Sequence, residues 1–100
     1  MDKARALNVR YTKRALAQID EVLTYIEARS LQGASHARDR IAALIALLQA
    51  HPYAGRPTTR AYVRRLPVNP YPYLIDYRVT VTEIVIMRFR HAARRPPRTR

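Results

Sequence analysis

The chain has 100 residues and no cysteine, which predicts one small domain and excludes disulfide bonds and thiolate metal sites. Hydrophobic residues make up 48% of it, which excludes wholesale disorder, and no apolar run approaches the ~20 residues needed to span a membrane. The formal net charge is +12, of which residues 1–50 carry +3 and residues 51–100 carry +9. Such asymmetry predicts a polyanionic or strongly acidic partner for the C-terminal half, and we expect a cytoplasmic location. A general preference for arginine, with 17 Arg against two Lys, would explain the residue type but not the scarcity of acids among the arginines.

The first half of the chain predicts one strand and two helices. Leu7 to Tyr11 alternates apolar and polar residues, as a strand with one buried face does. From Lys13 to about Arg29 apolar residues recur every three or four positions, which predicts an amphipathic helix capped by Thr12. Gly33 predicts a break, followed by a second helix from about Ser35 to Ala50. The short connection predicts an antiparallel helical hairpin.

The second half predicts a loop and three strands. Pro52 and the following Gly and Pro residues predict a loop over residues 51–57. Alternation predicts strands over residues 61–66, 73–80 and 83–90, and the short last connector predicts antiparallel pairing. The expected fold class is therefore α+β: a small antiparallel sheet packed against an N-terminal helical hairpin, in the order strand, helix, helix and three strands.

The same patterns predict which side chains are buried. The residues expected between the hairpin and the sheet are Leu16, Ile19, Leu23, Ile41, Leu44, Leu48, Ile75 and Tyr77. Strict alternation along residues 83–90 places Ile84, Ile86, Arg88 and Arg90 on one face, and Val85, Met87 and Phe89 on the other. We expect a single domain over residues 1–94 and a basic, flexible tail over residues 95–100.

Five segments, in chain order, resemble the ParE/RelE superfamily of toxins from type II toxin–antitoxin systems. They are the opening strand with Tyr11–Ala15, Ala37–Leu48 leading into His51-Pro52 and Gly55-Arg56, Val63–Leu66, Tyr71–Val79, and Ile84–Arg94. Together they span residues 7–94, and the resemblance implies the sheet-and-hairpin fold predicted above. It also implies a cognate antitoxin, ParD-like and acidic in its toxin-binding tail, that forms a hetero-oligomer with the toxin.

The superfamily divides by target. ParE-like members poison DNA gyrase, whereas RelE-like members cleave messenger RNA on the ribosome. Gly55-Arg56 and the ending from His91 to Arg94 resemble the ParE side, and Lys occurs only at positions 3 and 13, so the lysine-rich strand of the nucleases is missing. The resemblance favours a gyrase inhibitor that causes growth arrest. An mRNA endoribonuclease is the alternative, and a plain nucleic-acid-binding module with a basic sheet face is a third possibility.

Arginine supplies most of the candidate site residues. For target binding we expect Arg88, Arg90, His91, Arg94 and Arg95, and for antitoxin binding Arg64, Arg65 and Arg78. A gyrase poison needs no catalytic residue of its own; a ribonuclease would draw on Arg64, Arg88 and His91 for charge stabilisation and proton transfer. We expect Asp76 to form an ion pair with Arg64, Arg78 or Arg88. No metal, cofactor or membrane contact is expected, and DNA contact is expected only through the antitoxin or the gyrase complex.

Overall fold

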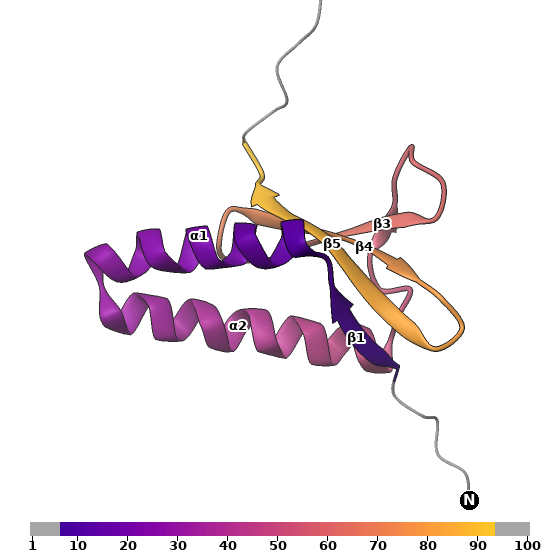
Figure 1. The fold of residues 1–100 in the computed structure, drawn as a ribbon, viewed down its shortest axis with the longest axis horizontal. Helices are drawn as coiled ribbons and strands as arrows, with labels where there is room; N and C mark the ends of the chain where they lie inside the picture. Colours follow the sequence, from indigo (N-terminus) through magenta and orange to yellow (C-terminus); the bar gives the residue numbers. More distant parts are fainter. Residues whose placement is uncertain (1–6, 94–100) are drawn as a thin grey trace, which may run out of the picture.

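A helical hairpin lies against one side of a twisted sheet in this computed structural model, which describes residues 7–93 (Figure 1). The elements are β1 (Asn8–Tyr11), α1 (Lys13–Arg29), α2 (Leu31–Ala50), β2 (Arg56–Pro57), β3 (Val63–Pro67), β4 (Tyr73–Val79) and β5 (Glu83–His91). The predicted α+β class and the order of the predicted elements are confirmed. The predicted tail over residues 95–100 lies outside the described residues.

The sheet is mixed, with strand order β1-β5-β4-β3-β2. Strands β2 to β5 are antiparallel neighbours, as expected, but β1 runs parallel to β5, with Asn8 opposite Glu83 and Tyr11 opposite Ile86. The expectation of a wholly antiparallel sheet therefore missed β1, whose partner lies more than 70 residues away and is set by the path of the helical hairpin. Arg56 and Pro57, expected in a loop, form the short edge strand β2, where a proline is tolerated because one side needs no donor.

A β-bulge interrupts the pairing of β4 with β5. Tyr77 pairs with Ile86 while the preceding Asp76 pairs with Arg88, so Met87 is an extra residue on β5. The bulge shifts the alternation by one: Phe89 joins Ile86 in the hydrophobic core, and Arg88 lies on the opposite face. The prediction that Arg88 shares a face with Ile86 was therefore wrong, because it assumed an unbroken period of two.

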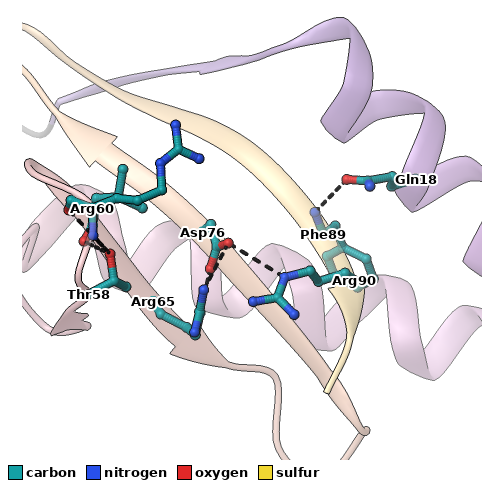
Figure 2. A network of polar contacts seen from close by, with 8 residues as sticks. Gln18, Thr58, Arg60, Arg65, Asp76, Phe89 and Arg90 are labelled. Atoms are coloured by element: carbon teal, nitrogen blue, oxygen red, sulfur yellow. Dashed lines mark hydrogen bonds and ion pairs between the residues drawn. The ribbon is translucent and has the colours of Figure 1, made fainter. Parts of the chain in front are cut away.

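Helix α1 covers the edge of β5 beyond the end of β1. The Thr12 hydroxyl donates a hydrogen bond to the Met87 carbonyl (3.0 Å), and the Gln18 side-chain oxygen accepts one from the Phe89 amide (2.8 Å; Figure 2). These contacts satisfy backbone groups that β1, ending at Tyr11, cannot reach. The bulge is thus held on its free side by the helix that follows the first strand.

A single extended residue, Ser30, joins the two helices. Its backbone N–H donates to the Ile26 carbonyl at the end of α1, and its hydroxyl accepts from the Gly33 amide (2.8 Å) at the start of α2. Helix α2 therefore begins at Leu31, and the predicted break at Gly33 with a helix start at about Ser35 was wrong. Gly33 lies in the first turn, where amide groups lack intrahelical partners and a serine cap supplies one.

The core confirms most of the predicted buried residues and corrects the face of α1. Ile41, Leu44, Leu48, Ile75 and Tyr77 are buried, whereas Ile19 and Leu23 are only partly buried. Leu16 is 52% exposed, and the neighbouring Ala15, which is fully buried, faces the sheet instead. Both residues fit a helical spacing to Ile19, so the spacing could not decide between them.

Truncation of two leucines tests this core. Leu48→Ala is expected to lower the free energy of unfolding by about 2–5 kcal/mol, because Leu48 is fully buried and its removal leaves a cavity. The matched change Leu16→Ala should stay within about 0.5 kcal/mol, since Leu16 is largely exposed. Urea unfolding monitored by circular dichroism measures both, and equal losses would show that the register of α1 is wrong.

Candidate functional site

The face of the sheet turned away from α1 and α2, here called the open face, carries a row of charged side chains. Arg65 on β3 lies opposite Asp76 on β4, and Asp76 lies opposite Arg88 on β5. Arg90 joins the row from the next outward position of β5, and Figure 2 shows Arg65 and Arg90 reaching Asp76 from two sides. The bulge creates this arrangement, because it turns Arg88 and Arg90 outward while Phe89 stays in the core.

Asp76 is the centre of a partly buried ion-pair network. Its carboxylate is 3% exposed and accepts hydrogen bonds from Arg65 Nε (2.7 Å) and Nη2 (3.3 Å). Arg90 Nε lies 3.6 Å from Asp76 Oδ2, the oxygen that also accepts from Arg65 Nη2; this distance is close enough for an ion pair but too long for a hydrogen bond. The hydrogen bond to Asp76 raises the pKa of Arg65, although burial opposes the shift. Asp76 thus has the structural ion-pair role that we expected, but its partners are Arg65 and Arg90, and the prediction of Arg64, Arg78 or Arg88 as the partner was wrong.

Arg88 is a cation without an ion-pair partner within residues 7–93. Its Nε is shielded from solvent and has no hydrogen-bond acceptor among the described residues. Burial and the positive charges of Arg14 and Arg90 lower the pKa of Arg88, and Asp76 only partly offsets them. A guanidinium group remains protonated in proteins, so its charge stays uncompensated at this position.

A groove of about 720 Å³ lies between the open face and the segment that joins β2 to β3. We call it the arginine groove, after the four arginines that line it: Arg56, Arg60, Arg65 and Arg88. Val63 and Leu74 supply apolar surface, and Asp76 is the single acid among the described residues that line the groove. Thr58 fixes the turn that carries Arg60, since its hydroxyl donates to the Val63 carbonyl (2.9 Å) and accepts from the Arg60 amide (3.1 Å).

The three arginines expected to bind an antitoxin do not lie together. Arg65 and Arg78 belong to the open face, because they occupy alternate positions with Val63 and Asp76. Arg64 lies on the helix-facing side, where its guanidinium donates to the Gly55 carbonyl (2.6 Å) and stacks over the Tyr53 ring at 4.9 Å. Successive residues of a strand point to opposite faces, so Arg64 and Arg65 cannot form one patch.

The residues expected for RNA cleavage are also separated. Arg88 lies on the open face, whereas Arg64 and His91 lie on the opposite one. The His91 ring packs edge-on against Tyr73 (5.4 Å between centroids), and its Nδ1 accepts from the Ala93 amide (3.1 Å). The described residues therefore bring no acid, base and cation of this set to one point.

The target-binding set is divided in the same way. Arg88 and Arg90 are neighbours on the open face, His91 faces away from them, and Arg94 and Arg95 lie outside the described residues. Arg60 was not predicted as a site residue, because it belongs to a turn and neither a helical nor a strand period assigns it a face. Among residues 7–93 no three His, Asp or Glu side chains gather as a metal site would require.

Neither helix of the described part of the chain is long and apolar enough to cross a membrane.

Fold and site together define a small, basic α+β domain with an arginine-rich open sheet face. The sequence model of the family described as the ParE toxin of the type II toxin–antitoxin system parDE matches residues 9–96. A curated relative from Sinorhizobium fredii (strain NBRC 101917 / NGR234), named "Putative toxin Y4kP", is 33% identical over 89 residues, which cover 89% of this chain and 92% of that protein. The chain therefore belongs to the ParE toxin family of type II toxin–antitoxin systems.

Solved structures agree with this membership. A chain of the structure titled "Chromosomal ParDE TA system from P. aeruginosa" has a TM-score of 0.75 and 26% identity, covering 88% of this chain and 98% of that one. A chain of the E. coli DinJ-YafQ toxin–antitoxin complex has a TM-score of 0.61 over 88% of this chain and 94% of that one. At 14% identity the second match shows a shared fold only.

Proposed function

We propose that this toxin acts in the cytoplasm by inhibiting DNA gyrase and that a ParD-like antitoxin neutralises it. Membership of the ParE family supports the target class, and the relative from P. aeruginosa is part of a ParDE system. The observation that carries the proposal is the open face, which offers a cationic binding surface with no assembled acid–base pair. A poison that traps gyrase on cleaved DNA needs a complementary surface and no hydrolytic group of its own.

The separation of Arg88 from His91 argues against the ribonuclease alternative. RNA cleavage requires a base for the 2′-hydroxyl, a cation for the developing charge and an acid for the leaving oxygen, all within hydrogen-bond reach of the scissile phosphate. Arg64 is engaged by the Gly55 carbonyl and the Tyr53 ring on the helix-facing side of the sheet. His91 packs against Tyr73 on that same side, away from the groove.

Purified protein with gyrase, ATP and supercoiled plasmid is expected to accumulate linear DNA after the complexes are denatured. Arg88→Gln should lower the yield of trapped complexes by about tenfold, because truncating a desolvated charge at an interface costs at least that much in affinity. Arg38→Gln removes the same charge from the exposed surface of α2 and should leave the yield unchanged. His91→Ala should reduce the yield of trapped complexes only modestly, because the His91 ring packs against Tyr73 and accepts a hydrogen bond at the end of the strand.

Two parallel measurements decide between the targets. Expression in bacteria should arrest growth, with DNA breaks appearing before mRNA is lost, and co-expression of the antitoxin should restore growth. Programmed ribosomes incubated with the protein should keep their mRNA intact. Codon-positioned cuts that disappear in His91→Ala would instead establish the ribonuclease and refute the gyrase proposal.

A further inference from the structure

Arg88 lacks a counter-ion because Asp76, the acid opposite it, already pairs with Arg65 and Arg90. Asp76 accepts two hydrogen bonds from Arg65 and forms an ion pair with Arg90. The other charges that act on Arg88 are positive: Arg14, Arg90 and Arg60. The Arg88 guanidinium has a shielded Nε–H without an acceptor and no ion-pair partner, which is costly, and an anion bound to the part of it that lines the groove would offset its positive charge. The described part of the chain supplies no such anion.

The shape and lining of the arginine groove favour a peptide as the source of that anion. Val63, Pro67 and Leu74 provide apolar surface beside Arg60 and Arg88. No aromatic ring lines the groove, so it lacks the stacking platform on which single-stranded nucleic acids rely. An acidic segment that alternates apolar and carboxylate side chains would match both parts of the lining.

We propose that the arginine groove binds an acidic peptide segment, in which one Asp or Glu carboxylate pairs with the Arg88 guanidinium and with Arg60. An adjacent apolar side chain of the segment lies against Val63 and Leu74. Arg65 contributes less, because its guanidinium already forms two hydrogen bonds to Asp76. The expected pairing residues thus change from Arg64, Arg65 and Arg78 to Arg60 and Arg88.

This inference rests on the proposed function for the identity of the segment, which would be the acidic tail of the antitoxin. Arg88 also belongs to the surface proposed for the target. An antitoxin segment in the groove would therefore cover that surface, and neutralisation would occur by direct competition between antitoxin and gyrase for the same guanidinium.

Binding of a fluorescein-labelled hexaglutamate peptide tests the groove without gyrase or antitoxin. At about 0.15 M salt, where long-range attraction is largely screened, Arg60→Gln and Arg88→Gln should each weaken binding about tenfold. Arg38→Gln, which removes the same charge from the exposed face of α2, should weaken it less than about twofold. A hexaglutamine peptide should not bind, because it offers no carboxylate.

A second measurement reads the proposed contact directly. In the ¹H–¹⁵N spectrum of the unsubstituted protein, the Arg88 Nε–H signal should shift as hexaglutamate is added, because a carboxylate then lies against the same guanidinium. Thermal unfolding checks that each variant folds. If Arg88→Gln does not fold, the spectrum of the unsubstituted protein still tests the contact.

Two outcomes would overturn the inference. Equal losses in Arg38→Gln and Arg88→Gln, with no shift of the Arg88 signal, would show diffuse charge attraction and no site. A short single-stranded oligonucleotide that binds in an Arg88-dependent manner, while hexaglutamate does not, would assign the groove to nucleic-acid phosphate. Because gyrase is absent from the assay, a negative result for the groove does not contradict the proposal that gyrase is the target.

Discussion

Replacing Gly55 with alanine is expected to lower the free energy of unfolding by about 2–5 kcal/mol, through overpacking and the loss of a buried hydrogen bond. A Cβ at this position would lie 2.7 Å from the Tyr77 hydroxyl oxygen and 2.8 Å from the Arg65 carbonyl oxygen. The carbonyl belongs to β3, which pairs with both β2 and β4, so the backbone cannot give way locally. Gly55 is needed here for close approach, since its φ is not in the left-handed region.

The hydrogen bonds of Tyr77 explain why the loop approaches so closely. The Gly55 amide donates to the Tyr77 hydroxyl (2.8 Å), which in turn donates to the Pro52 carbonyl (2.8 Å). Tyr77 is fully buried, and burial raises the pKa of its hydroxyl, which keeps it protonated as a donor must be. This side chain therefore ties the loop after α2 to the middle of the sheet, next to Arg56 and the arginine groove.

Urea unfolding of three variants separates the contributions. Tyr77→Phe removes both hydrogen bonds with little change in volume and should cost about 1–3 kcal/mol. Gly33→Ala is the control: its Cβ would meet two side chains, Ser30 at 3.1 Å and Ile26 at 3.4 Å, and no backbone atom of a strand. Alanine also favours the helix, so the change should stay within about 1 kcal/mol. If Gly55→Ala is as well tolerated as Gly33→Ala, the close approach of the loop to Tyr77 is wrong.

Features set by neighbouring residues could be predicted from the sequence. Helix α1 runs from Lys13 to Arg29 with Thr12 as its cap, as predicted, because its period and its cap are both local. Strands β4 and β5 were located to within one residue for the same reason. The start of α2 was predicted too late in the chain because glycine has a low helix propensity. The hydrogen bond from the Gly33 amide to the Ser30 hydroxyl outweighs that propensity.

Features set by distant contacts could not be predicted. The parallel pairing of β1 with β5 depends on the path of the chain through both helices. No local signal marks Met87 as an extra residue, yet the bulge there decides that Phe89 is buried and that Arg88 faces outward. The composition of the site was foreseen as arginine-rich, but its geometry was not: Arg64 and Arg65 alternate across the sheet, and the turn residue Arg60 approaches Arg88.

Replacing Asp76 with asparagine is expected to lower the free energy of unfolding by about 3 kcal/mol, the lower end of the usual cost of removing one partner from a buried ion pair, because Asp76 is buried but the Arg65 side chain is partly exposed. An amide has nearly the shape of the carboxylate but none of its charge. The change would leave the guanidinium groups of Arg65, Arg88 and Arg90 together on one side of the sheet with no negative charge among the groove's lining residues. Arg65 would keep one acceptor, the amide oxygen, and lose the other, because an amide nitrogen donates and does not accept. The repulsion among the three guanidinium groups would act on the bulged pairing that sets residue 76 opposite Arg88.

The exposed pair between Arg10 and Glu83 provides the matched control. Arg10 Nε lies 3.1 Å from Glu83 Oε2, with the arginine side chain 55% exposed, so Glu83→Gln should cost no more than about 1 kcal/mol. A double-mutant cycle isolates the coupling between Arg65 and Asp76. Arg65→Met should lower the free energy of unfolding several times less in the Asp76→Asn background than in the unsubstituted protein, because the negative charge that Arg65 pairs with is already absent. If Asp76→Asn and Glu83→Gln lower the free energy of unfolding equally little, Asp76 does not organise the open face. Its pairing with Arg65 and Arg90 then does not explain why Arg88 lacks a counter-ion.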